Sequence, residues 1–393
     1  MMRMKQSFYY NGTILTMEGH VPQYVEAVLV EGGVIQAVGE RSVLERDLHK
    51  KAQMINLRGK TMLPGFVDGY SGLAQTAYER ACKHSKGKVP SIPYLLREIT
   101  ETVKWYASYG ITTAQEATCG EREWQLLRLA GLLGRLPIDV ACYFKVDYAD
   151  GNLPMCVPKQ NLYSMRVRKA GCSGILTEPS LRETIATCLE RNWQLSMYVD
   201  CEADVEQFLH CYESVLTQYP EKRDLRPVLI NAETIRKDQL KRCEELGILL
   251  SFGIDRIYYR GDLLFEKESG AEYTERMLPL RTALRAGLSV SVHQGTPDAE
   301  PNMIFSIHNA VNRVSKNGRI LGEQERISPY EALRTVTIQA AYRLFEEEHK
   351  GSIRAGKDAD FVILDKNPLK VAPEKIRDIR VVETIKRDKR VWR

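Results

Sequence analysis

Polar residues directly follow several short apolar runs of this sequence, and they are the residues that could do chemistry. Glu116 and His293 are two of them, and together they could act as general acid and base in a hydrolase or isomerase. A lone carboxylate more often binds a neighbouring loop, however, and His293 could simply maintain a backbone turn. The other polar residues at such positions are Tyr70, Gln115, Lys145, Asp147, Tyr198, Asp200, Asn231, Glu233, Asp255 and Gln294.

Three acidic residues offer a second kind of site. Asp200, Glu202 and Glu233 could form a carboxylate cluster that holds a metal ion. Side chains alternate along a strand, so some of the three would point away from a common axis, which disfavours this reading. Tyr70 and Tyr198 also have an interpretation as packing residues, because a phenol ring fills space in a core.

The elements that must position these residues are strands alternating with amphipathic helices. Short apolar runs at 139–144, 195–199, 227–230, 248–252 and 288–292 are typical of parallel strands buried on both faces. Capping boxes at 180–183 and 328–331 predict two helix starts. The repeated units favour an α/β fold, a (β/α)8 TIM-like barrel, whose functional residues lie past the carboxyl ends of its strands. A doubly wound sheet is the competing architecture.

Both ends of the chain read as β structure. Residues 8–16 predict a hairpin with its turn at Asn11-Gly12, and residues 25–30 and 34–38 predict another around Gly32-Gly33. Strands are also expected at 360–365 and 381–386. Because strands must pair, we predict a small composite β-sandwich domain formed by both termini, residues 1–60 and 351–393, with the barrel at 61–350.

Composition restricts the partners and the compartment. The 56 Lys and Arg are interspersed with 51 Asp and Glu, so we expect no nucleic-acid partner. The basic run 386–390 is predicted to be a solvated terminal hairpin. No apolar stretch is long enough to span a membrane, and no signal peptide is apparent. Nine scattered cysteines without a C-x-x-C pair indicate buried thiols of a cytoplasmic protein.

Several motifs resemble the amidohydrolase superfamily, in its amidohydrolase-3, N-substituted formamide deformylase-like branch. Residues 62–73 (MLPGFVDGYSGL) are similar to its first barrel strand, and residues 110–117 (GITTAQEA) to its second. Residues 351–365 (GSIRAGKDADFVILD) resemble the passage from the barrel to the β domain, and residues 332–344 the helix before it. The resemblance implies the same barrel and composite domain. The segment between Tyr70 and Gly110 is shorter than in active relatives.

The resemblance also implies a divalent metal, usually zinc, which activates a water molecule for hydrolysis. The positions that correspond to its ligands are Tyr70, Gly72, Tyr198, Asn231 and Gly295, and none of these is a usable zinc ligand. We therefore expect no metal cofactor. The first hypothesis is a pseudoenzyme whose pocket, made of Tyr70, Glu116, Tyr198, Asn231, His293 and Gln294, binds a small polar ligand or a protein partner. The alternatives are a carbon–nitrogen hydrolase with a rebuilt site, and a subunit of a larger assembly or homo-oligomer.

Overall fold

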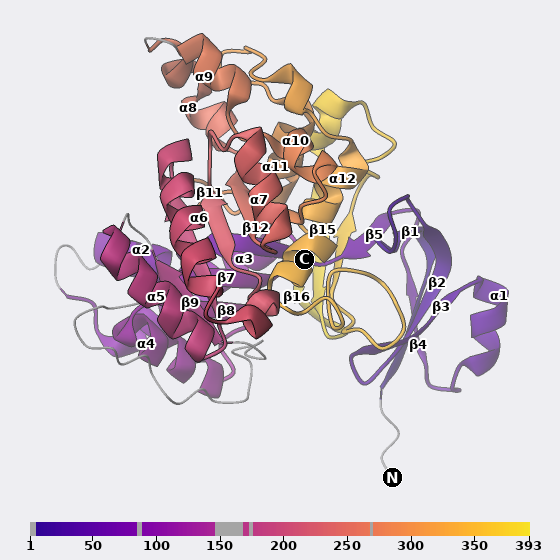
Figure 1. Ribbon diagram of the computed structural model, residues 1–393. Helices are drawn as coiled ribbons and strands as arrows, with labels where there is room; N and C mark the ends of the chain where they lie inside the picture. Colours follow the sequence, from indigo (N-terminus) through magenta and orange to yellow (C-terminus); the bar gives the residue numbers. More distant parts are fainter. Residues whose placement is uncertain (1–4, 85–88, 146–167, 173–175, 268–269) are drawn as a thin grey trace.

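The computed structural model describes residues 5–84, 89–145, 168–172, 176–267 and 270–393 (Figure 1). Strands from both ends of the chain form one sheet, in the order β16-β15-β14-β5-β1-β2-β3, with β4 paired to β1. A short helix, α1 (Arg41–Leu44), lies beside this terminal sheet. The strands are β1 (Gln6–Leu15), β2 (Tyr24–Glu31), β3 (Val34–Gly39), β4 (Gln53–Asn56), β5 (Thr61–Pro64), β14 (Phe361–Leu364), β15 (Val381–Lys386) and β16 (Lys389–Trp392).

Two tight hairpins in the terminal sheet follow from their turn residues. Gly32 and Gly33 have φ angles of 61° and 84° and join β2 to β3 as predicted. Arg387 and Asp388 also have positive φ angles, and they join β15 to β16. Such turns match the twist of antiparallel strands.

The hairpin predicted at Asn11-Gly12 is wrong. Residues 6–15 form one strand, β1, whose register against β2 shifts between Tyr10 and Ile14. Asn11 has a φ of 59°, so the Asn-Gly pair makes a bulge in place of a turn. A side chain at Gly12 would meet the carbonyl oxygen of Lys60 at 2.6 Å, which explains the glycine.

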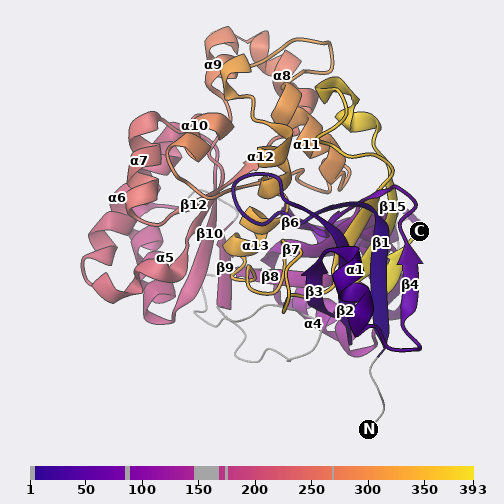
Figure 2. The same cartoon turned by 90° about the vertical axis from the view of Figure 1, so that its right-hand side faces the viewer.

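The second sheet is the predicted barrel. Its eight parallel strands pair in sequence order, from β6 to β13. This order has no reversal point, which excludes the doubly wound sheet. Figures 1 and 2 show helices around the barrel strands and the terminal sheet to one side. The strands are β6 (Phe66–Ser71), β7 (Ile111–Cys119), β8 (Asp139–Lys145), β9 (Arg168–Cys172), β10 (Trp193–Val199), β11 (Val228–Asn231), β12 (Leu249–Gly253) and β13 (Val290–His293).

The helices cover the barrel with their apolar stripes. The capping box at Ser328 and Glu331 begins α12 as predicted, whereas α5 begins one turn before Ser180, after Thr177. The helices are α2 (Leu73–His84), α3 (Ile92–Ser108), α4 (Glu121–Leu132), α5 (Glu178–Glu190), α6 (Glu202–Leu216), α7 (Lys237–Glu245), α8 (Arg256–Phe265), α9 (Gly270–Arg276), α10 (Leu280–Arg285), α11 (Met303–Asn312), α12 (Pro329–Thr335) and α13 (Ile338–Arg343).

A buried arginine completes the barrel where its first and last strands meet. Arg343 ends α13 and reaches inside, where it donates to the Gly69 carbonyl oxygen of β6 and to Gln115 Oε1 of β7 at 2.7 Å. It also donates to Ser251 Oγ of β12 at 3.1 Å. A Cβ at position 69 would lie 2.5 Å from Arg343 Nη1, so the glycine leaves room for the guanidinium. Arg343 thus links β6 and β7, at the beginning of the barrel, to β12 near its end.

Buried ion pairs join the barrel to the terminal sheet. Asp139, the first residue of β8, accepts from Lys350 and lies 2.6 Å from Lys386 Nζ of β15. Lys386 also donates to Asp360 at 2.5 Å. Burial opposes ionisation of Asp139, but the neighbouring cations outweigh it and lower its pKa to about 2. The basic run 386–390 is therefore a hairpin, but Lys386 and Asp388 are buried in it, not solvated.

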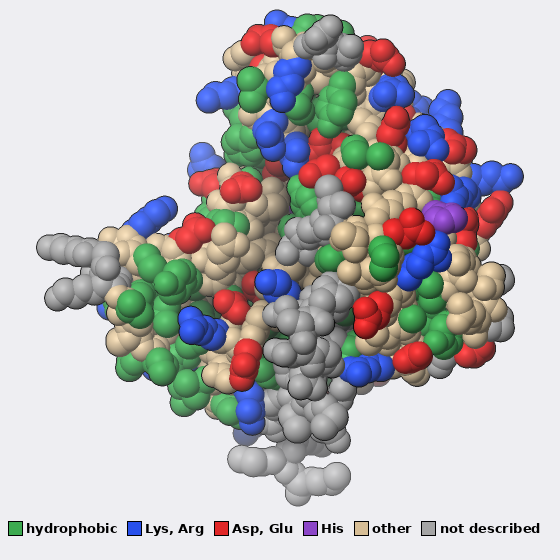
Figure 3. Space-filling model, turned by 60° about the vertical axis from the view of Figure 1, so that its left-hand side comes forward, with side chains coloured by type: hydrophobic (Ala, Val, Ile, Leu, Met, Phe, Trp, Pro, Cys, Tyr) green, Lys and Arg blue, Asp and Glu red, His purple; other side chains and the backbone are tan. Residues whose placement is uncertain are grey.

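The surface shown in Figure 3 mixes cationic and anionic side chains, with no large area of one sign. Among the described residues, no helix is long and apolar enough to cross a membrane. Eight of the nine cysteines lie in the described ranges, and all eight are free thiols. Most are buried as predicted, but Cys201 is exposed.

Candidate functional site

A cavity of about 500 Å³ opens at the carboxyl ends of the barrel strands. We call it the mouth cavity. Residues from β6, β10, β11, β12 and β13 line it, so strand ends that are far apart in sequence face one space. The sequence-predicted residues that the structure brings together there are Tyr70, Gly72, Tyr198, Asn231, Asp255, His293, Gln294 and Gly295.

Aromatic rings occupy one side of the mouth cavity. The Tyr70 ring centre lies 5.0 Å from that of His293 and 6.3 Å from that of Tyr198. Burial raises the pKa of Tyr70 to about 12, and it also raises the pKa of Tyr198. Both phenols therefore stay protonated at neutral pH and can donate a hydrogen bond.

The protonation state of His293 follows from the residues beneath it. Its Nδ1 lies 3.0 Å from Ser251 Oγ, which already accepts hydrogen bonds from Ser291 Oγ and Arg343 Nη1. The Ser251 proton must then go to Nδ1, which leaves the imidazole proton on Nε2. Burial, with the nearby charges of Arg343 and Arg256, lowers the pKa of His293 well below its usual value. His293 is thus neutral and presents an N–H donor to the cavity.

Arg256 brings a positive charge to the wall of the mouth cavity. It is the first residue of α8, and its guanidinium pairs with Glu233 and lies 3.4 Å from the Tyr198 hydroxyl. Glu233 in turn accepts from the Tyr273 hydroxyl at 2.6 Å. Asn231 faces the same space, since its Oδ1 and His293 Nε2 both lie within 3.2 Å of where a Cβ on Gly253 would be. Arg256 therefore adds a charged donor to this part of the cavity, and Asn231 Oδ1 adds an acceptor.

Glu116 does not line the mouth cavity. Its carboxylate is buried and accepts from the Ala74 backbone N–H at 2.8 Å, at the start of α2. Burial raises its pKa to about 8. An acid–base mechanism would need Glu116 and His293 to face the same space, and of the two only His293 lines the mouth cavity.

Two buried carboxyl groups brace the loops around the cavity. Asp68 accepts from Gln294 Nε2 at 2.8 Å and from the Tyr70 backbone N–H. Asp255 accepts from Asn309 Nδ2 and Ser306 Oγ, which ties the end of β12 to α11. Burial raises the pKa of each carboxyl to about 7.

The carboxylate cluster considered from sequence does not form. Asp200 is exposed, and within the described residues Asp200, Glu202 and Glu233 make no group close enough to share a metal ion. The acids that do lie within such a distance, Asp139, Asp358 and Asp360, are far from the mouth and neutralised by Lys350, Lys386 and Arg387. Gln115 binds Arg343 inside the barrel, and Lys145 is exposed at the end of β8. Asp147 lies outside the described residues.

Sequence reasoning missed two arginines of the site. Arg256 directly follows Asp255, so its position after β12 was a usable signal. Arg343 gives no such signal, because it lies on a helix that follows the barrel and reaches the interior only through tertiary packing.

The amidohydrolase family model matches residues 71–392. The chain belongs to the amidohydrolase family. The N-substituted formamide deformylase of Arthrobacter pascens is 29% identical over 185 residues, which cover 47% of this chain but only 33% of that protein. The imidazolonepropionase of Fusobacterium nucleatum is 22% identical over 376 residues, or 86% of this chain and 84% of the relative.

Solved structures share the fold of this chain. An uncharacterized metal-dependent hydrolase from Pyrococcus horikoshii OT3 matches with a TM-score of 0.80 and 13% identity, over 94% of this chain and 99% of that one. An adenosine deaminase from Xanthomonas campestris, solved with bound zinc, matches with a TM-score of 0.63 and 13% identity, over 98% and 92%.

The residues of the mouth cavity do not fit the metal that the family implies. Zinc sites use thiolate, imidazole or carboxylate ligands. Here His293 turns a protonated nitrogen to the cavity, and its other nitrogen is bound to Ser251. Two carboxylates also line the cavity, but Asp255 is bound by Ser306 and Asn309, and Asp298 is exposed. Among the described residues, no three acidic, histidine or cysteine side chains at this cavity lie close enough to share an ion. Asn231 offers a neutral amide, Tyr70 and Tyr198 are protonated phenols, and Gly72 and Gly295 have no side chain.

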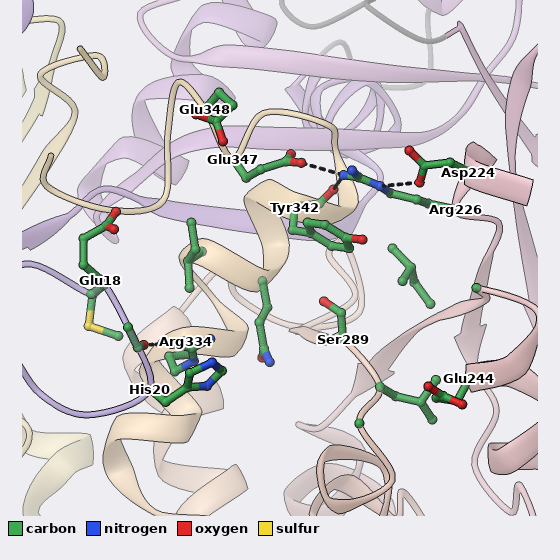
Figure 4. Close-up of a pocket in the computed structure, with 18 of the residues that line it drawn as sticks. Glu18, His20, Asp224, Arg226, Glu244, Ser289, Arg334, Tyr342, Glu347 and Glu348 are labelled. Carbon is green, nitrogen blue, oxygen red and sulfur yellow. Dashed lines mark hydrogen bonds and ion pairs between the residues drawn. The ribbon is translucent and has the colours of Figure 1, made fainter. Parts of the chain in front are cut away.

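A second cavity, of about 600 Å³, lies at the opposite end of the barrel, where residues just before β11, β12 and β13 line it. Figure 4 shows its lining side chains. Arg226 lies over the Tyr342 ring at 3.8 Å and pairs with Glu347 and Asp224. Glu18 and Glu348 have cationic partners as well. The charges of this cavity largely neutralise one another, as expected of a junction between the barrel and the β1–β2 loop.

Proposed function

We propose that this chain is a metal-free amidohydrolase-family protein that binds a small polar ligand in the mouth cavity without hydrolysing it. The donor set of that cavity carries the proposal. Of the five positions that the family would use to hold a metal, Tyr70 and Tyr198 are now phenols that donate hydrogen bonds, Asn231 is a neutral amide, and Gly72 and Gly295 have no side chain. Without an activated water, an amide-type bond in the cavity is not cleaved.

The donors also define the ligand chemistry. His293 Nε2, the Tyr70 and Tyr198 hydroxyls and Arg256 all offer protons to one space. A ligand with a carbonyl or carboxylate group would satisfy several of them at once, and bonds to a charged acceptor would be the stronger ones. The free thiols suit a reducing compartment, which supports the cytoplasm as its location.

A carbon–nitrogen hydrolase with a rebuilt or relocated site is the second candidate. Family membership and the likeness to a formamide deformylase favour it. This candidate needs a metal or an acid–base pair, and Glu116, one member of the pair predicted from sequence, does not line the mouth cavity.

Metal content separates the two candidates. The protein would be purified from medium supplemented with zinc and manganese and analysed by mass spectrometry. We expect well under one metal ion per chain, and no hydrolysis of N-substituted formamides. Near-stoichiometric metal together with metal-dependent hydrolysis would overturn the proposal.

A ligand-binding assay tests the proposal independently of metal content. A thermal-shift screen of small carboxylates and amides should yield ligands whose affinity falls about fivefold in Tyr198→Phe, which loses one hydrogen bond in the mouth cavity. Tyr342→Phe is the matched control, since it removes a hydroxyl from the opposite cavity. Equal effects of the two variants would place the ligand elsewhere.

A further inference from the structure

Positive charge gathers in one hollow of the terminal sheet. Its volume is about 650 Å³, and residues of β4, β15 and β16 line it. Figure 2 shows β4 and β15 at its right-hand side. We call it the basic groove and define it by six basic and two acidic side chains, a net charge of +4. These are Lys5, Arg58, Lys60, Lys389, Arg390 and Arg393, with Glu383 and Asp388.

The two acids do not neutralise the groove. Glu383 is shared by Arg390 at 3.1 Å and Arg393 at 3.8 Å. Asp388 accepts from the Tyr9 and Ser7 hydroxyls and lies 3.4 Å from Lys5 Nζ. The Asp388 carboxylate therefore already binds two hydroxyl groups of the terminal sheet.

Three cations of the groove remain without an acidic partner among the described residues. They are Arg58, in the turn after β4, Lys60, before β5, and Lys389, the first residue of β16. Each side chain makes no ion pair in this part of the structure. On the face that Figure 3 shows, by contrast, cationic and anionic side chains are mixed.

Two free strand edges border the groove. Among the described residues, β4 pairs only with β1 and β16 only with β15. Their outer backbone groups are therefore open, and N–H groups at such an edge add donors for an anion. The volume lies within the range of small-molecule sites, about 300 to 1,000 Å³.

We propose that the basic groove binds a small polyanion that carries two or more phosphate groups. The site is distinct from the mouth cavity and does not depend on the function proposed there. The basic run at 386–390 contributes to two features. Lys386 forms buried ion pairs, whereas Lys389 and Arg390 line the basic groove.

Calorimetric titration of the full chain with inorganic triphosphate tests the proposal. We expect triphosphate to bind more tightly than monophosphate, with an affinity that falls as salt screens the charges. The double variant Arg58→Glu, Lys389→Glu should weaken triphosphate binding by about tenfold or more. The matched control reverses two exposed cations outside the groove, Arg128→Glu and Lys237→Glu, and keeps the same net charge.

Equal weakening in both double variants would overturn the proposal, because it would mean attraction to net charge alone. Binding of a ten-nucleotide single strand more tightly than triphosphate would overturn the assignment to a small ligand.

Hydrogen exchange on the unmutated protein gives a readout that needs no variant. Triphosphate should slow exchange in β4 and β16, and protection confined to the barrel mouth would contradict the proposal. Titration with a nucleoside triphosphate beside inorganic triphosphate shows whether a base adds affinity.

Discussion

His293 keeps one tautomer because the groups beneath it leave no choice. Ser251 receives two hydrogen bonds and has a single proton to give, and that proton goes to Nδ1. The neutral ring cannot act as a general base through Nε2, which already carries a proton. A residue that from sequence could be a catalytic base thus becomes a donor to whatever occupies the mouth cavity.

Nitrogen NMR can observe this tautomer directly. Long-range proton–nitrogen spectra should show His293 protonated on Nε2 and unprotonated on Nδ1 between pH 6 and pH 8. Ser251→Ala removes the donor to Nδ1, so a mixture of tautomers should appear. A signal from doubly protonated His293 at pH 6 would contradict the assignment, since burial lowers the pKa of this ring.

Glu116 should make the protein less stable as pH rises. Its folded-state pKa of about 8 exceeds the ordinary value of 4.5, so between these limits the folded state binds more protons than the unfolded state. The stability linked to this group is full below pH 4.5 and is lost as pH rises through about 8. Glu116→Gln has no such group. Its free energy of unfolding, measured in urea, should equal that of the unmutated protein near pH 5 and exceed it near pH 9.

The control for this experiment is Glu121→Gln, on an exposed residue of α4. It should follow the unmutated protein at every pH. A stability difference between Glu116→Gln and the unmutated protein that does not change with pH would show that Glu116 is ionised throughout.

At the level of elements, the start of β8 and the C-terminal hairpin are joined by charge. Asp139 lies between two buried lysines, one before β14 and one at the end of β15. A charged lysine that is buried without an acidic partner costs several kcal/mol of folding free energy, on the order of the desolvation penalty of one ion. The hairpin is thereby held against the barrel as well as against its own sheet.

Asp139→Asn should lower the free energy of unfolding by about 3 to 5 kcal/mol, the usual cost of breaking a buried ion pair by removing one partner. Urea unfolding at pH 7 measures the change. The Asp139 pKa is lowered from 3.8 to about 2, so its stabilising effect is fully present above pH 3.8 and is lost as pH falls from there through about 2. Glu178→Gln, in an exposed pair with Arg182, is the control and should change stability little. A loss no larger than that of the control would mean that the lysines find other partners.

At the level of the whole molecule, the barrel and the terminal sheet share a core. Leu15, Leu63 and Val362 of the terminal sheet belong to the same buried cluster as the barrel residues Phe66 and Val103. Thr384 of β15 donates to the Ala107 carbonyl oxygen of α3 at 2.6 Å. The two parts therefore stabilise each other.

Removal of residues 381–393 should abolish cooperative unfolding of the entire chain, the barrel included. It takes away β15, β16 and Lys386, the partner of Asp139. Scanning calorimetry would show one sharp transition in the intact chain and none at that temperature in the shortened one. Removal of Arg393 alone, which is exposed, is the control. A shortened chain that keeps a sharp barrel transition would show that the barrel folds independently.

The sequence by itself determined the barrel, the terminal sheet and most of the mouth. Alternating apolar runs and helices give parallel strands, and residues after such strands must meet at one end of the barrel. Tyr70, Tyr198, Asn231 and His293 could be placed together for that reason.

Only the tertiary structure decided what these residues can do. The tautomer of His293 depends on Ser251, Ser291 and Arg343, which come from three separate elements. The Glu116 side chain points to the start of α2, where it accepts a hydrogen bond from the Ala74 backbone N–H. No local sequence pattern predicts this contact. The Asn11-Gly12 bulge was mistaken for a turn because the pairing of β1 with distant β4 and β5 outweighs local turn preference. Chemistry at a site depends on the proton donors and charges that surround it, and those are brought together by packing between segments far apart in the chain.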